Sequence, residues 1–212
     1  MQKPIIILGA GSLGKVALDI FRSHDWLVYC FLDEDNSLQN TQIDDISILG
    51  SYTEDKFLKL IDDHSDVFVA LDHPEKRQEA IQNVLKKRRK MPINAFHKDS
   101  FWEVSAVLGS GNLFFARSYV GTNAHIGNHC ILGASAIVDY EAILADNVQV
   151  GAGAVINAKV KIGEGAFIGS GATIAPNLKI GKNAKIVAGS MVVKDVADNE
   201  TVFGMPAQKI GV

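Results

Sequence analysis

Three consecutive polar side chains, Asp139, Tyr140 and Glu141, interrupt a stretch in which small turn residues recur every six positions. A Tyr phenol, with a pKa near 10, is almost wholly protonated at neutral pH and acts as a donor or orienting group rather than as a base. Glu141 would need a pKa raised by about 2 or 3 units to act as a general base at pH 7. The stretch therefore predicts a turn of the repeat, here called a corner, whose side chains orient a nucleophile or move its proton. The alternative is a corner that is merely polar.

A second group with chemical potential is the turn formed by Gly9, Gly11 and Gly14, which matches G-x-G-x-x-G and has Asp33 about 20 residues further on. The N–H groups of such a turn receive a phosphate at the start of the following helix. A dinucleotide site normally needs two mononucleotide halves, and the chain has room for only one before its repeats begin. The pattern favours a mononucleotide-sugar site, with a dinucleotide site or a purely structural turn as alternatives.

The elements that carry this turn alternate between strand and helix. Apolar runs predict strands, and amphipathic runs with Pro74 at the first turn of the last one predict helices. The expected strands are 3–10, 26–33, 66–72 and 91–97, and the expected helices are 13–24, 54–64 and 74–90. This order predicts a small parallel sheet with helices on its faces, a Rossmann-like α/β half-domain over residues 1–98.

From Trp102 a period of six replaces the helical period. Position one of sixteen successive units is apolar, at Trp102, Leu108, Phe114, Val120, Ile126, Leu132, Val138, Leu144, Val150, Ile156, Ile162, Ile168, Ile174, Ile180, Ile186 and Val192. Such a repeat predicts an all-β parallel β-helix over residues 99–212, with position one pointing inward and three units closing one coil of 18 residues. Glycine is frequent at position two, where we expect it to supply backbone freedom at the corners.

The 18-residue coil makes His125 a further candidate base. His125 precedes Ile143 by one coil, about 4.8 Å, and Ile143 begins the strand that leaves the Tyr140 corner. A solvated surface histidine is the alternative.

Composition excludes several classes of partner. A net charge of −3 with 21% charged residues gives no reason to expect nucleic acid or a membrane surface as a partner. No stretch approaches the roughly 18 uninterrupted apolar residues of a membrane span, so we expect a cytoplasmic protein. Cys30 and Cys130 have no zinc-ligand spacing, and we expect no metal.

The Gly-rich front, the strand end CFLDED, the unbroken hexapeptide solenoid and the terminal VFGMPAQ together resemble the bacterial sugar acyltransferases of the left-handed β-helix class. The group most similar contains sialic acid O-acetyltransferases and the UDP-4-amino-sugar N-acetyltransferases of bacillosamine pathways. The resemblance implies a homotrimer, a front domain that holds a nucleotide-linked sugar, and acetyl-CoA in the groove between adjacent solenoids.

The same resemblance implies roles for individual residues. A His-acid pair at a solenoid corner and a second His nine residues later are replaced here by Tyr140, Glu141 and Gln149. Gln149 is then expected to contact pantetheine, and the Ala158 N–H to bind the thioester carbonyl. Further small residues expected along the cofactor arm are Ala166, Gly169, Ser170, Ala188 and Gly189. In the front domain, Ser12 and Leu13 would lie beside the sugar diphosphate, and Asp33 and Glu34 at the ribose or base. Leu71, Asp72 and Arg77 stand where the family shows Ile-Gly-Asn-Asn before an Arg, with Asp72 departing from that pattern.

The missing imidazoles bear on the reaction. A neutral amine attacks a thioester without a strong base, whereas an alcohol is far harder to activate. This favours N-acylation, and together with the resemblance it implies an acetyl-CoA-dependent N-acetyltransferase acting on a nucleotide-linked amino sugar, with UDP as the expected nucleotide, for surface glycan synthesis. The alternatives are a sugar O-acyltransferase and a non-catalytic trimer that binds sugar nucleotides.

Overall fold

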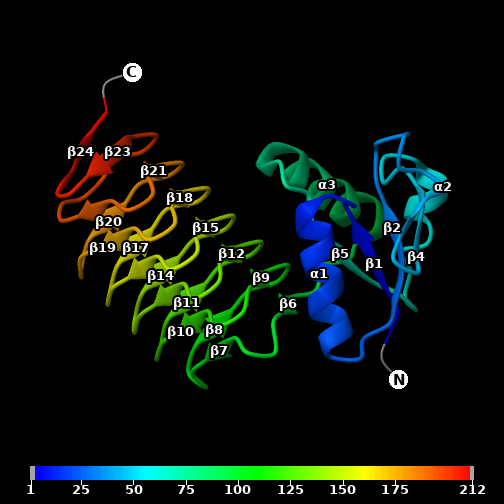
Figure 1. Cartoon of the computed structure of the whole chain (residues 1–212), viewed down its shortest axis with the longest axis horizontal. Helices are drawn as coiled ribbons and strands as arrows, with labels where there is room; N and C mark the ends of the chain where they lie inside the picture. The colour runs from blue at the N-terminus through cyan, green and yellow to red at the C-terminus, as the bar shows by residue number, and fades with distance from the viewer. Residues whose placement is uncertain (1–2, 211–212) are drawn as a thin grey trace. The chain divides into compact units, whose positions relative to one another are not determined.

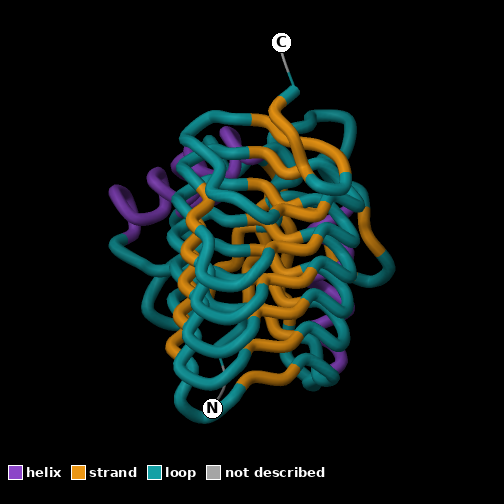
Figure 2. The backbone as a smooth tube through the Cα atoms, turned by 90° about the vertical axis from the view of Figure 1, so that its left-hand side faces the viewer, coloured by secondary structure: helices purple, strands orange, loops and turns teal. Residues whose placement is uncertain are grey.

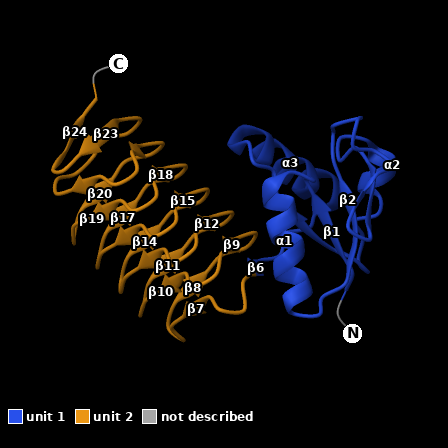
Figure 3. Cartoon of the chain, viewed as in Figure 1, with its two compact units in different colours: residues 1–95 blue, residues 96–212 orange. Residues whose placement is uncertain are grey.

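The computed structural model describes residues 3–210. The chain forms two compact units, residues 1–95 and 96–212, shown in different colours in Figure 3. The sequence-based boundary lies between residues 98 and 99. Within residues 3–210, no helix has both the length and the apolar composition that crossing a membrane requires.

The N-terminal unit is an α/β unit built on a five-stranded sheet in the order β3-β4-β2-β1-β5 (Figure 1). Its strands are β1 (Ile5–Leu8), β2 (Val28–Leu32), β3 (Gln42–Ile43), β4 (Ile46–Gly50) and β5 (Asp66–Val69), and its helices are α1 (Ser12–Ser23), α2 (Asp55–Leu58) and α3 (Pro74–Arg88). All pairings are parallel except β3 with β4. The ring of Phe21 on α1 meets that of Phe68 on β5 edge-on, at 5.6 Å between centroids. Burying such aromatic side chains stabilises the unit by about 1.5–3 kcal/mol each.

Two features of this unit differ from the sequence-based expectation. The helix expected over 54–64 is the single turn α2, because Ser65 satisfies backbone groups outside a helix: its hydroxyl accepts from the Asp62 N–H at 3.0 Å and donates to the Leu60 carbonyl at 2.8 Å. The hairpin β3–β4 was not expected from the sequence, and it makes the sheet mixed rather than wholly parallel.

The strand expected over 91–97 is also different. Only β6 (Ala95–Phe96) forms, and it joins the solenoid sheet next to β9 rather than the front sheet.

The C-terminal unit is a parallel β-helix of three sheets, and Figure 2 shows its coils stacked so that the strands align in columns. One sheet holds β7 (Phe101–Trp102), β10 (Tyr119–Val120), β13 (Ile137–Val138), β16 (Val155–Ile156), β19 (Thr173–Ile174) and β22 (Met191–Val192). A second holds β8 (Val107–Leu108), β11 (His125–Ile126), β14 (Ile143–Leu144), β17 (Lys161–Ile162) and β20 (Lys179–Ile180). The third holds β6, β9 (Leu113–Phe114), β12 (Ile131–Leu132), β15 (Gln149–Val150), β18 (Phe167–Ile168), β21 (Lys185–Ile186), β23 (Thr201–Gly204) and β24 (Ala207–Lys209).

The predicted hexapeptide phase is confirmed. Each two-residue strand ends on a position-one residue, and partners in neighbouring coils differ by 18, as in Val138 with Ile156. From Phe114 to Val192 every position-one side chain is buried. The first coil is the exception: Trp102 is 37% exposed because it lies at the end of the stack and has a coil on one side only.

The expected role of the position-two glycines is wrong. Gly109, Gly121, Gly127, Gly133, Gly151, Gly163, Gly169 and Gly181 do not adopt positive φ; a Cβ at these positions would instead collide with the backbone of the next coil. At Gly133, for example, it would lie 2.6 Å from the Ala152 nitrogen. These glycines are required for close approach between coils.

The left-handed backbone conformation occurs instead at position four, in every unit from Leu108 to Ile186. Glycine holds this position in some units, and Asn, Ser, Lys, Arg, His or Glu holds it in others, including Glu141 at φ 55°. Asn and Gly adopt this conformation with least strain.

The stack ends in a shortened coil. Val196 pairs with Ile180 and Val202 with Ile186, an offset of 16 rather than 18 residues. The antiparallel hairpin β23–β24 follows and completes the third sheet.

The two kinds of glycine give a stability prediction. Gly133→Ala should lower the free energy of unfolding by about 1–3 kcal/mol, because the added methyl group presses on the next coil. Gly153→Asn, in the next coil at position four, should cost less than about 1 kcal/mol, because φ is +65°, which Asn tolerates, and a Cβ there meets open space. Urea unfolding measures both, and equal losses would contradict this account of position two.

Candidate active site

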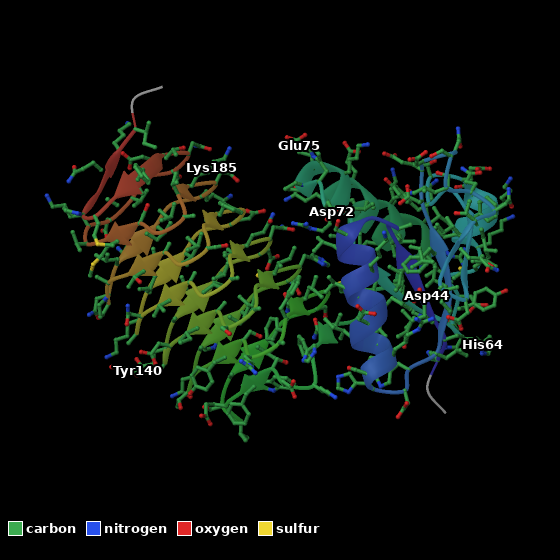
Figure 4. The ribbon with its side chains drawn as sticks, viewed as in Figure 1. Asp44, His64, Asp72, Glu75, Tyr140 and Lys185 are labelled. Atoms are coloured by element: carbon green, nitrogen blue, oxygen red, sulfur yellow. The ribbon has the colours of Figure 1, made fainter. Side chains whose placement is uncertain are left out.

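The Asp139–Glu141 corner joins β13 to β14. The Asp139 carboxylate accepts the backbone N–H of Tyr140 at 2.7 Å, and the Glu141 N–H donates to the Thr122 carbonyl of the preceding coil at 2.9 Å. Asp139 therefore braces the corner, while the Tyr140 side chain, 46% exposed, projects from it. Figure 4 shows Tyr140 at the outer edge of the solenoid.

Sequence reasoning missed a fourth member of this corner. Lys159, at position four of the next coil, places its ammonium nitrogen 3.8 Å from a Glu141 carboxylate oxygen, and both side chains are half exposed. The Lys159 N–H also donates to the Tyr140 carbonyl at 3.1 Å. The 18-residue spacing from Glu141 was the signal that could have found it. The corner thus presents a phenol beside an exposed ion pair.

His125 lies on β11, directly opposite Ile143 in the parallel ladder, as the spacing predicts. Its imidazole is exposed, and Nδ1 lies 3.0 Å from the Asn123 carbonyl oxygen. That contact orients the ring. It leaves Nε2, which is directed away from the backbone of His125, as the nitrogen that could act as a base.

Ala158 occupies position three of the coil after Tyr140. At this position the N–H of Ser110, Asn128, Tyr140 and Lys182 is taken by a side-chain oxygen. Among the hydrogen bonds of residues 3–210, none uses the Ala158 N–H, and the same holds at position three of other units, at Thr122, Ala152, Ser170 and Ala188. The structure therefore leaves a backbone donor one coil away from Tyr140.

Gln149 does not lie beside Tyr140. It is nine residues further on, half a coil, and belongs to β15 in the third sheet, whereas the Tyr140 corner joins the first sheet to the second. Figure 1 shows β9, β12, β15, β18 and β21 along one side of the solenoid and the labels of the other two sheets along the opposite side. In Figure 4, Tyr140 projects from one side and Lys185, two coils above Gln149 in the same column, from the other.

The remaining cofactor candidates lie at the other two corners of the coil. The turns after β18 and β21, which both join the third sheet to the first, contain Gly169, Ser170, Ala188 and Gly189. Gly169 is buried and the other three are exposed. Ala166 has no exposed surface, since position five points into the core, and it therefore has no direct contact to offer a cofactor.

A cavity of about 610 Å³ opens at the C-terminal end of the second sheet. Lys161 and Lys179, register neighbours on β17 and β20, line it together with Lys182, Asp195 and Asp198. Lys161 and Lys179 repel each other across adjacent strands, but Asp195, Asp198 and Glu200 line the same cavity and offset their charge.

In the front unit, internal packing explains two glycines of the Gly-rich turn. Gly9 has φ +105°, and a Cβ there would lie 2.7 Å from the Ala70 carbonyl oxygen. A Cβ at Gly14 would collide with the Gly9 carbonyl. Asp33 is 9% exposed, and its carboxylate accepts the N–H of Ala10 at 2.7 Å and that of Asp35 at 2.9 Å. Asp33 therefore fastens the end of β2 to the turn.

The start of α1 is occupied by a side chain of the same chain. The Asp72 carboxylate accepts the Ser12 N–H at 3.1 Å and the Leu13 N–H at 3.3 Å. These are the groups expected beside a sugar diphosphate. Leu71 and Arg77 are buried next to this loop, and the Arg77 guanidinium donates to the Leu71 carbonyl at 3.1 Å.

Glu34 is the centre of a small polar cluster beside the turn. It accepts hydrogen bonds from the Lys76 ammonium group and from the Tyr52 hydroxyl. The bond from Lys76, above all, holds the pKa of Glu34 below its ordinary value, and the same bond raises the pKa of Lys76. Burial and the neighbouring Glu34 raise the pKa of Tyr52. Within residues 3–210, no cluster of three or more His, Cys, Asp or Glu side chains could hold a metal ion.

Comparison with family models divides the chain in the same way as the structure. Residues 4–84 match the PglD N-terminal domain. Residues 141–176 and 159–194 match the bacterial transferase hexapeptide (six repeats), and residues 123–158 match the hexapeptide repeat of succinyl-transferase. The comparison with curated proteins found no match.

Solved structures match nearly the whole chain. A His-to-Asn mutant of perosamine N-acetyltransferase from Caulobacter crescentus, in complex with CoA and GDP-perosamine, is 26% identical with a TM-score of 0.89, over 99% of this chain and 97% of that one. The chain belongs to the PglD-like family of hexapeptide-repeat sugar N-acetyltransferases. WeeI from Acinetobacter baumannii is 25% identical with a TM-score of 0.86, over 99% of this chain and all of that one.

The acetyltransferase domain of PglB from Neisseria gonorrhoeae, in complex with acetyl coenzyme A, is 23% identical with a TM-score of 0.90, over 99% of this chain and all of that one. At that identity it supports the fold alone. The parallel β-helix of this chain agrees with the fold that the repeat predicts.

The Glu34 cluster gives a pH-dependent prediction. Because the folded-state pKa of Glu34 lies below its ordinary value of 4.5, its contribution to stability is present above pH 4.5 and is lost as the pH falls through the folded-state pKa. Glu34→Gln should therefore lower the free energy of unfolding at pH 7 by less than about 1 kcal/mol, since the pair is partly exposed, and by progressively less below pH 4.5.

Urea unfolding at pH 7, 5 and 4 checks this, with Asp19→Asn on the exposed face of α1 as the control. A loss that grows as the pH falls would contradict the assignment.

Proposed function

We propose that this protein transfers the acetyl group of acetyl-CoA to the amine of a nucleotide-linked sugar, with UDP as the expected nucleotide, in the synthesis of a surface glycan. The observation that carries the proposal is the likeness, over 99% of the chain, to an N-acetyltransferase structure that holds CoA and a nucleotide-linked amino sugar. The front unit would hold the nucleotide, and the solenoid would hold the thioester.

The chemistry of the corner favours an amine over an alcohol as the nucleophile. The exposed groups there are the Tyr140 phenol and a Glu141 carboxylate paired with Lys159, and no imidazole belongs to the corner itself. A neutral amine attacks the thioester carbonyl carbon with its own lone pair, the C–S bond breaks, CoA leaves as the thiolate, and the surplus proton passes to water. An alcohol would have to lose its proton to a base during the attack.

The residues then take separate roles in the proposal. The Ala158 N–H would bind the carbonyl oxygen as negative charge develops on it, which is the contribution of an oxyanion-hole donor. Tyr140 and Glu141 would orient the amine, with His125 as the reserve base from the neighbouring strand.

The placement of Gln149 bears on the assembly. Because Tyr140 and Gln149 lie on opposite sides of one solenoid, they line one site only if two copies contribute to it. We therefore propose a homotrimer in which acetyl-CoA lies between adjacent solenoids. The outward face of the first sheet suits association, since Phe101, Ile137 and Met191 on it are 58%, 38% and 39% exposed. Lys161 and Lys179 are candidates for the phosphates of CoA.

The missing imidazoles also favour a second candidate, a non-catalytic trimer that binds sugar nucleotides. Thiol release separates the two. With acetyl-CoA and a panel of UDP- and GDP-linked 4-amino sugars, we expect release of CoA with an amino sugar and not with the matching 4-hydroxy sugar. Tight nucleotide binding without thiol release would favour the non-catalytic protein, and release with the alcohol would favour O-acylation.

Substitutions at the corner test the assigned roles. We expect Tyr140→Phe to lower kcat about 10-fold through loss of orientation, and Glu141→Gln and His125→Asn to lower it by less than about 10-fold, because an amine needs no strong base. Steady-state thiol release at saturating acetyl-CoA measures these effects. A loss of about 100-fold or more at His125 or Glu141 would identify a general base and overturn the unaided attack.

Subunit complementation tests the shared site. Tyr140→Ala and Gln149→Ala subunits, each slow alone, are coexpressed with different tags, and the mixed trimers are isolated. If each site takes Tyr140 from one copy and Gln149 from its neighbour, about a third of the sites in the isolated mixed trimers are intact and activity recovers to about that level. Activity no higher than that of the single variants would mean that the two residues do not form one site across copies.

A further inference from the structure

The start of α1 already holds an anion. Gly11, the residue before the helix, has no side chain with which to cap it, and the first helical N–H groups are bound by Asp72 from the loop after β5. One carboxylate oxygen lies at each of the two nitrogens, Oδ2 at Ser12 and Oδ1 at Leu13. In Figure 4, Asp72 lies at the end of α1 where the helix begins. This is the arrangement in which a phosphate oxygen pair would bind.

The Asp72 side chain explains why residue 11 is a glycine, without a bound ligand. A Cβ on Gly11 would collide with Oδ2 of Asp72. The close approach of the backbone, for which glycine is normally needed beside a pyrophosphate, is used here by a carboxylate of the same chain. Together with the packing reasons for Gly9 and Gly14, every glycine of the motif has an internal explanation.

The charge around the turn also disfavours a second anion. Asp33 binds the Ala10 N–H on the other side of Gly11, and Glu34 and Asp35 follow it along the chain. Two cations lie near the turn: Lys76 is paired with Glu34, and the Arg77 guanidinium donates to the Leu71 carbonyl. A phosphate at Ser12 and Leu13 would have to displace Asp72 and then lie among these carboxylates, so both the lost hydrogen bonds and the repulsion oppose it.

We propose that Asp72 is a specificity-determining residue that keeps phosphate away from the start of α1. Where a ligand carries a diphosphate, that group lies outside the turn and adds little to affinity through it. The ligand is selected by its nucleoside and sugar. The nucleotide part of this inference rests on the proposed function, whereas the exclusion of phosphate by Asp72 does not.

The experiment compares the wild-type protein with Asp72→Asn and Asp72→Gly by isothermal titration calorimetry. Asp72→Asn keeps the shape of the side chain and one acceptor oxygen but removes the charge, and Asp72→Gly empties the position. The probes are inorganic pyrophosphate, UDP with uridine, and GDP with guanosine. Asp62→Asn is the matched control, because Asp62 is another exposed carboxylate of the same unit that accepts one backbone N–H, that of His64.

For the wild-type protein we expect the diphosphate to bind within about threefold of its nucleoside, and pyrophosphate to show no measurable binding. In Asp72→Gly the preference for the diphosphate over the nucleoside should rise about tenfold or more, with a smaller rise in Asp72→Asn and none in Asp62→Asn. Thermal unfolding of each variant separates a loss of helix capping, which would weaken all ligands alike, from the gain for phosphate alone.

Two results overturn the inference. One is an unchanged preference for diphosphate over nucleoside, with unchanged pyrophosphate binding, in both Asp72 variants. The other is a strong preference in the wild-type protein that the variants lose. If no nucleoside or nucleotide binds any of the proteins but pyrophosphate binds the Asp72 variants alone, the exclusion by Asp72 stands and the nucleotide part of the proposed function fails.

Discussion

The register between coils is the constraint on which the solenoid depends. Each backbone ladder joins residues 18 apart, so one inserted residue would rotate every later side chain out of its column. This regularity brings Lys159 onto Glu141 and sets the Ala158 N–H one coil from Tyr140. It also separates Tyr140 from Gln149, since half a coil carries the chain to the opposite side. Which side chains are neighbours on the surface therefore depends on whether their sequence separation is a multiple of 18. A site that combines Tyr140 with Gln149 would belong to an assembly rather than to one chain.

The periodic part of the sequence predicts this framework almost residue by residue. Position one, from Phe114 to Val192, is buried as expected, because a side chain that recurs every six residues always meets the same neighbours in adjacent coils. The prediction failed at the ends, where Trp102 lacks a neighbouring coil and where the final coil has lost two residues. It also misjudged position two, because the sequence reveals that glycine recurs there but not whether φ or the next coil requires it.

The front unit was less predictable because its important contacts join residues far apart in the chain. The G-x-G-x-x-G spacing correctly indicated a turn between β1 and α1, but no local pattern places Asp72 against Ser12, 60 residues away. The same holds for the bond from Lys76 to Glu34 and for the β3–β4 hairpin. A motif states which backbone groups are available, and the fold decides what binds them. Asp72 departs from the family pattern in the sequence, and the structure supplies a physical meaning for that departure.

The hairpin β23–β24 has a consequence for end-to-end stacking of solenoids. A stack of parallel rungs ends in exposed backbone donors and acceptors on which another chain could continue the stack, as in a growing fibril. Here the terminal rung of the third sheet is followed by a strand that runs the opposite way, so the hydrogen-bond pattern of an added parallel rung no longer matches. The reversal, placed after a coil two residues short, therefore caps the C-terminal edge of the third sheet, whereas β22 and β20 remain the last strands of the other two sheets.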